Sequence, residues 1–271
     1  MLKGDLKQAL YYGPVSSTGD GHKMAEEIGA AMQLMDYGKV YPQGIESSKG
    51  IAKSTLQGNN AAYDHSGILV NADGKRIANE KGVGKAILSA MMKEKNATAF
   101  LVMDAPSFEA FRKIIGNNGI TPAEVDKWLA SNGKSAPIFA HGDTIEAAAA
   151  AADVNAENLK ATIKRYNGFV KAGKDDEFGR PVRFTKETVS DKGPYYIVEQ
   201  KPRFATSMGS VVVDTSLHVL DKAGNPIPNL YAAGEVANAV HGDDSAPGAN
   251  VGRGITSGKA VADVIVKEMK K

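Results

Sequence analysis

The sequence predicts a mixed fold, α+β or α/β in class, in which a discontinuous domain rich in strands and glycine is interrupted by a helix-rich lobe. Two observations predict this arrangement. Short strand-like runs with glycine turns occur near both ends of the chain, and helical periodicity dominates from about residue 85 to residue 172. We therefore expect one domain to be built from residues 1–60 and 186–271, and the lobe from residues 61–185. A chain of 271 residues, 42% of them hydrophobic, is long enough to bury both cores.

The first expected helix follows a glycine-rich turn at residues 18–21. Apolar residues recur at helical spacing from Met24 to Met35. The side chain of Thr18 or Asp20 is of the type that caps a first helical turn. A glycine-rich turn is thus expected to lead directly into a helix N-terminus.

Strands are expected on both sides of the lobe, where short β-type runs are bounded by turn residues. Two tight turns support them, Asn-Ala-Asp-Gly at 71–74 and Lys-Ala-Gly-Asn at 222–225. The expected strands lie at about 36–41, 67–70, 195–198, 210–214 and 230–233.

The lobe itself shows clear helix start and stop signals. Residues 121–124, Thr-Pro-Ala-Glu, form a capping box with proline at the first helical position. A similar signal, with Asp143 as the cap, precedes the six alanines at 147–152. A third helix is periodic from Leu159 and is expected to end at Gly173. These signals predict an α-rich module.

Composition and charge exclude several classes of function. The chain has 33 basic and 31 acidic residues without a pronounced basic cluster, so we expect neither nucleic-acid nor membrane-surface binding. Cysteine is absent, which rules out disulfides and thiolate chemistry. The histidines show no metal-ligand spacing, so no metal site is expected. No signal peptide or membrane span is recognisable, and we expect a soluble chain whose compartment stays open, since any leader would lie upstream.

Two glycine-rich turns lead into helices and indicate a nucleotide. The turn at 18–21 is one, and the run from Gly248 to Gly254 before a helix expected at about 255–269 is the other. Helix N-termini offer unpaired N–H groups and a partial positive charge to anionic oxygens. Between them, a strand ends at Gly234 and Glu235, whose carboxylate is suited to a ribose or ribityl hydroxyl. The dinucleotide fingerprint G-x-G-x-x-G is nevertheless missing from this chain.

Several segments taken in order resemble the FAD-dependent fumarate reductase group, which includes flavocytochrome c fumarate reductases and urocanate reductase and is related to succinate dehydrogenase flavoproteins. The segments are TGDGHKMAEEIGA, RYNGFVKAGKDDEFGR, SMGSVVVDT, IPNLYAAGEVANAVHG and ITSGKAVADV. The resemblance covers essentially the whole chain. It implies a partial FAD-binding domain interrupted by a helix-rich capping domain.

The resemblance also implies which residues meet FAD. The glycine turn would lie near the cofactor, Glu235 would bind its ribityl or ribose region, and the turn at Gly248 would bring backbone N–H groups to the flavin pyrimidine edge. The expected cofactor-binding residues are Thr18, Gly19, Asp20, Gly21, Gly234, Glu235, Gly248, Ala249, Asn250 and Val251.

One departure from the family is the missing Rossmann half, which carries the fingerprint in family members. We expect weak or absent FAD binding by the isolated chain and an uncovered part of the FAD-domain core. The partner expected is a chain or domain that supplies the Rossmann half, or an electron-donor domain.

A second departure concerns the substrate. Thr206 stands where fumarate reductases have a substrate-binding His, and Ser245 stands where they have the Arg that clamps a carboxylate. No Arg occupies the proton-donor position near residues 84 and 85, where Lys85 or Lys81 is the candidate substitute. Since Ser cannot reproduce the planar two-point contact of Arg, fumarate is not the expected substrate.

The expected function is therefore hydride transfer from reduced flavin to an activated C=C of a small unsaturated acid or related compound. Lys85, Thr206 and Ser245 are the candidate catalytic residues. Two alternatives remain open. One is a catalytically silent fragment or subunit that needs a partner chain, and the other is the reverse reaction, which forms the C=C bond.

Overall fold

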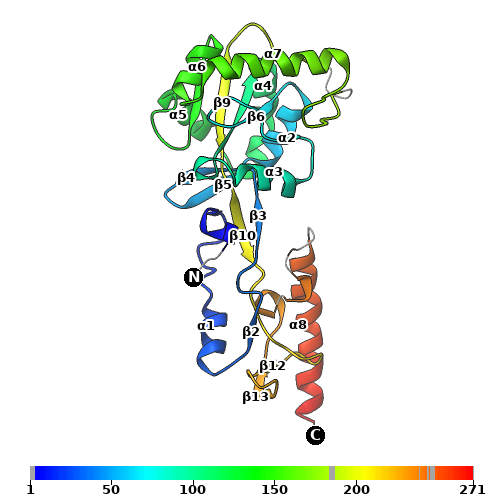
Figure 1. Ribbon diagram of the computed structural model, residues 1–271. Coiled ribbons are helices and arrows are strands. Elements are labelled where there is room, and N and C mark those ends of the chain that lie inside the picture. Colours follow the sequence, from blue (N-terminus) through cyan, green and yellow to red (C-terminus); the bar gives the residue numbers. More distant parts are fainter. Residues whose placement is uncertain (1–3, 183–186, 238, 243, 245–247, 271) are drawn as a thin grey trace. The chain divides into compact units, whose positions relative to one another are not determined.

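The computed structural model describes residues 4–182, 187–237, 239–242, 244 and 248–270. The chain divides into two compact units. We call the unit formed by Met1–Lys7, Gly13–Lys39 and Phe204–Lys271 the terminal unit, and the unit formed by Gln8–Tyr12 and Val40–Arg203 the central unit. Figure 1 labels most of their helices and strands.

The central unit is built on an antiparallel four-stranded sheet with the strand order β6-β7-β9-β8. Its middle strand β7 pairs with β9 along its whole length, from Ala99 opposite Gln200 to Asp104 opposite Tyr195. The four strands are β6 (Ile68–Val70), β7 (Ala99–Asp104), β8 (Phe139–Gly142) and β9 (Tyr195–Gln200).

Both faces of this sheet are covered by helices. Alternate residues of β7 point to opposite faces: Phe100 and Val102 pack in one core cluster, Leu101 and Met103 in another. Helices α6 (Ile145–Ala151) and α7 (Ala156–Ala172) supply the first cluster, whereas α2 (Leu56–Asp64), α4 (Ala105–Ile114) and α5 (Pro122–Ser131) supply the second. Because β7 is buried on both faces, its sequence is a continuous run of apolar residues up to Asp104 and does not alternate with polar residues.

The central unit also contains strands of a second sheet, whose order is β3-β10-β1-β5-β4, and helix α3 (Gly84–Met91). Strand β5 (Ile51–Ser54) pairs in parallel with β1 (Leu10–Tyr11) and antiparallel with β4 (Gly44–Ser48). The chain crosses from one unit to the other within β3 (Gly38–Tyr41) and β10 (Arg203–Ser207).

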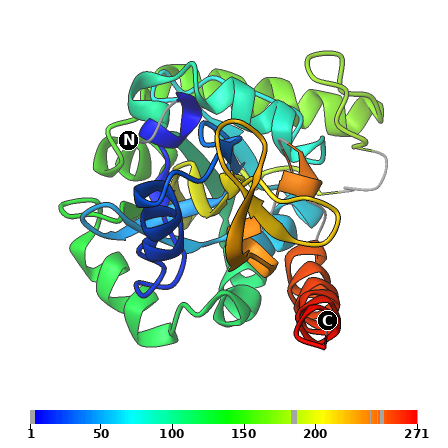
Figure 2. The same cartoon turned by 90° about the horizontal axis from the view of Figure 1, so that it is seen from below.

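The terminal unit has a much smaller core, formed by Ala30, Val211, Val219 and Ala237. Strand β2 (Met32–Gln33) pairs with β11 (Ser210–Val211), and β12 (His218–Leu220) forms a hairpin with β13 (Pro226–Tyr231). The helical elements are α1 (Asp20–Glu27), the 3₁₀ turns Gly234–Ala237 and Ala239–His241, and α8 (Ala249–Glu268), which is seen nearly end-on in Figure 2.

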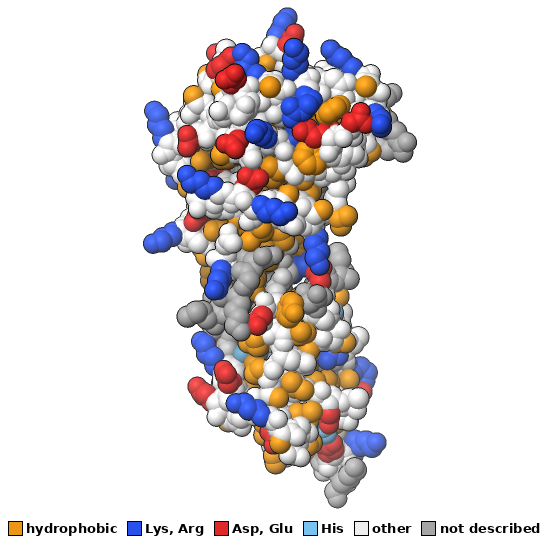
Figure 3. Space-filling model, in the orientation of Figure 1, with side chains coloured by type: hydrophobic (Ala, Val, Ile, Leu, Met, Phe, Trp, Pro, Cys, Tyr) orange, Lys and Arg blue, Asp and Glu red, His pale blue; other side chains and the backbone are white. Residues whose placement is uncertain are grey.

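The helices of the terminal unit bury very little. Helix α1 has no buried residue. In the 20-residue helix α8, Ser257 is the single residue that is buried. Hydrophobic side chains gather on the face of this unit drawn in Figure 3. We define the apolar surface as Met24 and Ile28 of α1 with Val251, Ile255 and Val266 of α8, which are 51–71% exposed.

Two predicted helix boundaries are wrong. Helix α1 ends at Glu27 instead of continuing towards Met35, because Gly29 adopts φ 88° and the amide of Ala30 closes the turn on Ala25. Its N-cap is Gly19, without a capping side chain. In the lobe, Thr144 rather than Asp143 caps α6 through the amide of Ala147.

The other helix caps and turns predicted from the sequence agree with the structure, whereas the start of the final helix does not. The capping box at Thr121 is present in full, with its hydroxyl accepting from the amide of Glu124. Gly173 ends α7, and the turns at 71–74 and 222–225 close by backbone hydrogen bonds. The final helix begins at Ala249, about six residues earlier than expected.

The central unit is larger than the lobe expected at 61–185. The sequence places residues 195–198 in the other domain, but β9 pairs with both β7 and β8 in the middle of the central sheet. Its buried residues Ile197 and Val198 belong to the two core clusters of that sheet. Long-range pairing thus places β9 in the central unit.

Two glycines with left-handed backbone provide a test of packing in the central unit. Gly74 has φ 73°, and a Cβ there would lie 2.5 Å from the carbonyl oxygen of Asn155. Gly173 has φ 70°, with nothing within 4 Å of such a Cβ. Gly173→Ala should cost about 1–2 kcal/mol from backbone strain alone. Gly74→Ala should cost about 1–3 kcal/mol more because the neighbouring backbone must move.

Urea unfolding followed by tryptophan fluorescence measures this difference, since Trp128 is the chain's single tryptophan and is buried in the central unit. Equal losses of unfolding free energy in the two variants would contradict the close packing of Gly74.

Candidate functional site: a flavin-type terminal unit and a buried charge cluster

The glycine turn before α1 is exposed. The hydroxyl of Thr18 donates to the carboxylate of Asp20 at 2.6 Å, and that hydrogen bond lowers the pKa of Asp20. Gly19 adopts φ 78°, a conformation that favours glycine. The turn therefore presents backbone and a short anionic side chain, and Thr18 is engaged locally instead of capping the helix.

The segment at Gly234 lies against this turn. A Cβ at Gly21 would be 3.2 Å from Cγ2 of Val236, so the structure brings the turn and the Gly234–Ala237 segment together. The amide of Gly234 donates to Oγ of Ser257 in α8 at 2.9 Å. Glu235 is exposed, and its carboxylate makes no hydrogen bond or ion pair within the described part of the chain.

The N-terminus of α8 begins at an uncapped glycine. Gly248 is the N-cap, with φ 79° and no side chain of its own to cap the first turn formed by Ala249, Asn250 and Val251. The first turn carries no acidic residue. A 20-residue helix with an uncapped start retains the partial positive charge that favours an anionic or carbonyl oxygen.

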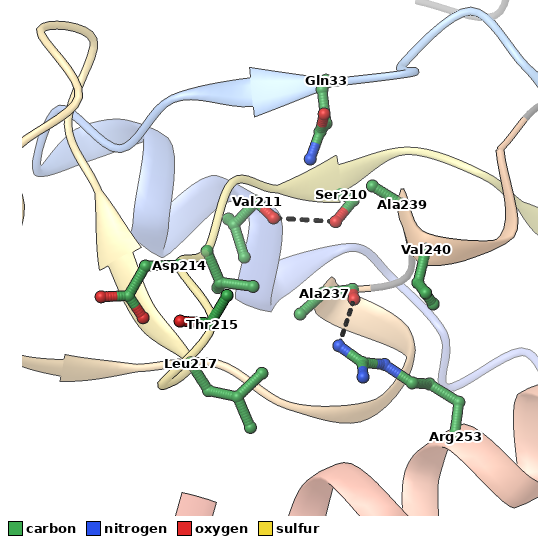
Figure 4. Close-up of a pocket in the computed structure, with 11 residues that line it drawn as sticks. Gln33, Ser210, Val211, Asp214, Thr215, Leu217, Ala237, Ala239, Val240 and Arg253 are labelled. Carbon is green, nitrogen blue, oxygen red and sulfur yellow. Dashed lines mark hydrogen bonds between the residues drawn. The ribbon is translucent and has the colours of Figure 1, made fainter.

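Arg253 connects α8 with the Gly234–Ala237 segment and was missed at the sequence level. Its guanidinium donates to the carbonyl of Ala237 at 3.4 Å, and its Nε is buried without a partner among the described residues. Figure 4 shows Arg253 at the edge of a cavity of about 400 Å³ in the terminal unit. The glycine run 248–254 contains Arg253, but only the fold shows which backbone it reaches.

None of the predicted site residues that the structure describes lines this cavity. Its walls come from β11, the loop after it, the two 3₁₀ turns and α8; the lining residues are Gln33, Ser210, Val211, Val213, Asp214, Thr215, Leu217, Ala237, Ala239, Val240 and Arg253. Figure 4 shows Asp214 and Arg253 coming from different elements around it.

The three candidate catalytic residues are placed separately. Thr206 is half-buried in β10 of the terminal unit, whereas Lys85 is exposed in the first turn of α3 in the central unit. The ammonium of Lys85 has no hydrogen bond or ion pair with the described residues, and Lys81 pairs with Asp64. Ser245 lies outside the described residues. The roles of all three stay predictions.

Four buried charged side chains gather in the central unit, and two of them lie shortly before Lys85 in the chain. We call Arg76, Glu80, Asp175 and Arg180 the charge cluster. Arg76 donates to both oxygens of Glu80, at 3.0 and 2.8 Å, and to Asp175 at 2.9 Å. Arg180 pairs with Glu80 at 3.3 Å. All four side chains are fully shielded from solvent.

The charge cluster ties three segments of the central unit together. Arg180 donates to the carbonyls of Tyr63 and Gly67, each at 2.7 Å, at the end of α2 and the start of β6. Its partners all lie within residues 61–185. Arg180 therefore connects segments inside the expected lobe. Glu80 also accepts from the amide of Leu69 in β6.

Electrostatics in the cluster favour the charged forms. Burial alone would raise the pKa of Asp175, but the hydrogen bond and charge of Arg76 outweigh it and hold that pKa below its usual value. Burial raises the pKa of the neighbouring Tyr166 phenol to about 12. The Arg76 guanidinium lies 4.9 Å from the centre of the Tyr166 ring, a cation–π distance.

Comparison with known proteins gives concordant results. Residues 2–251 match the family model described as an FAD binding domain. A fumarate reductase (cytochrome) of Shewanella frigidimarina is 28% identical over 270 residues, 100% of this chain and 43% of that protein. A urocanate reductase of Eggerthella lenta is 30% identical over 223 residues, 82% of this chain and 34% of that protein.

A solved structure shows the same similarity. The open conformation of a flavocytochrome c3 fumarate reductase superposes with a TM-score of 0.72 and 28% identity, over 96% of this chain and 42% of that one. The chain thus spans less than half the length of the curated relatives it matches.

Two other features, a membrane-spanning helix and a metal site, are not found among the described residues. None of the described helices has the length and apolar character needed to cross a bilayer. Within the same residues, no three histidine or carboxylate side chains gather as a metal site.

Asp175→Asn should destabilise the central unit by about 3–5 kcal/mol, because it leaves Arg76 buried with one carboxylate partner fewer. The folded-state pKa of Asp175 lies below 3.8, so ionised Asp175 stabilises at neutral pH and this stabilisation disappears as pH falls through that lowered pKa. The difference between wild type and variant should therefore be largest above about pH 5 and shrink in acid.

Asp176→Asn is the matched control, because Asp176 is exposed and pairs with the exposed Lys174. It should change the unfolding free energy by less than about 1 kcal/mol. Urea titrations at several pH values measure both variants, and equal small losses would contradict a structural role for the charge cluster.

Proposed function

Because the chain belongs to the FAD-binding family and is fumarate reductase-like, we propose that it forms the substrate-handling part of an FAD-dependent reductase of C=C bonds. The substrate class is a small unsaturated acid other than fumarate, or a related compound. The observation that carries the proposal is the clustering of the glycine turn, the Gly234–Ala237 segment and α8 in one unit.

The terminal unit fits the cofactor of this family, FAD. Glu235 keeps an exposed carboxylate for a hydroxyl, and α8 begins without a side-chain cap. When bound, reduced FAD supplies the hydride for the reaction. The backbone at the start of α8 would hold the negative charge that reduction places on the flavin pyrimidine edge. Gly19 and Gly21 would allow close approach of the backbone to the cofactor.

The remaining chemistry is proton delivery and substrate orientation. Lys85 is the proposed proton donor to the carbon next to the one that receives hydride. The charge cluster fixes the chain at Glu80, five residues before Lys85, and so holds the start of α3 in place. Thr206 is the proposed hydrogen-bonding residue for the substrate.

Rapid mixing of FAD-loaded, anaerobically reduced protein with acrylate, urocanate or fumarate tests this function. We expect reoxidation of the flavin by one of the two monoacids faster than by fumarate. Failure of every enoate to reoxidise the flavin, or fumarate as the best substrate, would overturn the proposal.

Lys85→Met should slow reoxidation by the enoate about 10²–10⁴-fold, the usual contribution of a positioned acid. Reoxidation by a one-electron dye, which requires no proton from this residue, should keep its rate. Lys95→Met, at an exposed position of the same unit, is the control and should leave both rates unchanged. Equal enoate rates in Lys85→Met and wild type would remove Lys85 from the mechanism.

The apolar surface of the terminal unit supports a second candidate. The exposed apolar side chains on α1 and α8 favour a subunit that is catalytically inactive by itself. In that case a partner chain that carries the nucleotide-binding half would cover the apolar surface. Under this alternative, the purified chain is colourless and does not take up FAD, and a yellow chain bleached by reduction favours the enzyme.

A further inference from the structure

Arg203 is a buried cation without a carboxylate partner. Its residue is 2% exposed, yet no ion pair joins it to the described residues. The other two buried arginines of the central unit, Arg76 and Arg180, each pair with a carboxylate. Burial lowers the pKa of Arg203, because taking a charge out of water disfavours it. An uncompensated guanidinium in such a position is a natural binding group for an anion.

Two aromatic rings lie close to the guanidinium of Arg203. The guanidinium carbon lies 4.2 Å from the ring centre of Tyr12 and 4.8 Å from that of Tyr41. The Tyr12 side chain is also hydrogen-bonded to the guanidinium, and the two rings restrict how that group can turn. Tyr12, Tyr41 and Arg203 all belong to the central unit.

One edge of the guanidinium is already used and another is not. Nε donates to the carbonyl of Gln43 at 2.6 Å, whereas Nη1 is buried without a hydrogen-bond partner among the described residues. Oε1 of Gln43 is likewise buried and unpartnered there. Buried donors of this kind are almost always satisfied, so an unsatisfied Nη1 points to a ligand.

One of the two rings reaches the surface. Tyr12 is 40% exposed and follows the two-residue strand β1, so a ligand would approach the guanidinium from the side of this ring. Arg203 also begins β10, the strand that carries Thr206 three residues further on.

We propose that Arg203 binds the single carboxylate of a small unsaturated acid, held in plane by Tyr12 and Tyr41. Nη1 donates to one carboxylate oxygen, with the Arg203 charge as the counter-ion. A single arginine can bind one carboxylate. Because Ser245 stands in place of the family's carboxylate-binding arginine, this chain has no second arginine there for a dicarboxylate. The identity of the acid rests on the proposed function, whereas binding itself requires no flavin.

The test uses the full chain with acrylate and with its uncharged isostere acrylamide. We expect acrylate to shift the assigned side-chain N–H signals of Arg203 in ¹⁵N NMR spectra in a saturable way, and acrylamide to leave them unchanged. This readout uses wild-type protein, so it does not depend on a variant that folds. Equal shifts with acrylamide or chloride, or no shift with acrylate, would overturn the proposal.

Calorimetric titration of Arg203→Lys gives a second readout. Lysine keeps the charge but loses the planar fork, so acrylate affinity should fall about 10-fold or more. Arg112→Lys, which changes an arginine paired with the exposed Asp126, is the control and should keep wild-type affinity. Wild-type affinity in a folded Arg203→Lys would contradict the assignment. If acrylate binds but no enoate is reduced, the carboxylate site at Arg203 is supported and only the proposed function is overturned.

Discussion

The pairing of two buried arginines with two buried carboxylates is the constraint on which the central unit depends. Arg76, Glu80, Asp175 and Arg180 come from segments about a hundred residues apart, and none of their side chains reaches solvent. Since an unpaired buried charge costs several kcal/mol, the end of α2, the turn after β6 and the segment after α7 must all be in place together. The cluster thereby fixes the start of α3, where Lys85 lies.

The terminal unit is organised differently. Its core is four small or medium apolar residues, and its helices keep most of their apolar side chains at the surface. What it offers for chemistry is mainly backbone: left-handed glycines at the starts of α1 and α8, and one exposed carboxylate at Glu235. Such groups suit a cofactor bound by hydrogen bonds and dipoles, with reactive chemistry supplied by the cofactor itself.

Local signals in the sequence predicted local structure well. The capping box at Thr121 and the helix stop at Gly173 depend on neighbouring residues only, and both are present. The prediction that the first helix continues towards Met35 is wrong, because the spacing of apolar residues does not reveal the left-handed backbone at Gly29. The place of β9 and the partners of Arg203 depend on pairing between distant segments, which periodicity does not encode.

Titration of the purified chain with FAD, followed by flavin absorbance, tests the central claim most directly. The account predicts a saturable spectral change that Glu235→Gln weakens and that Glu27→Gln, at an exposed position on α1, leaves unchanged. If the chain needs a nucleotide-binding half to take up FAD, the same difference between the variants should appear in the reconstituted complex. Equal FAD affinity for both variants and wild type would contradict the flavin site assigned to the terminal unit.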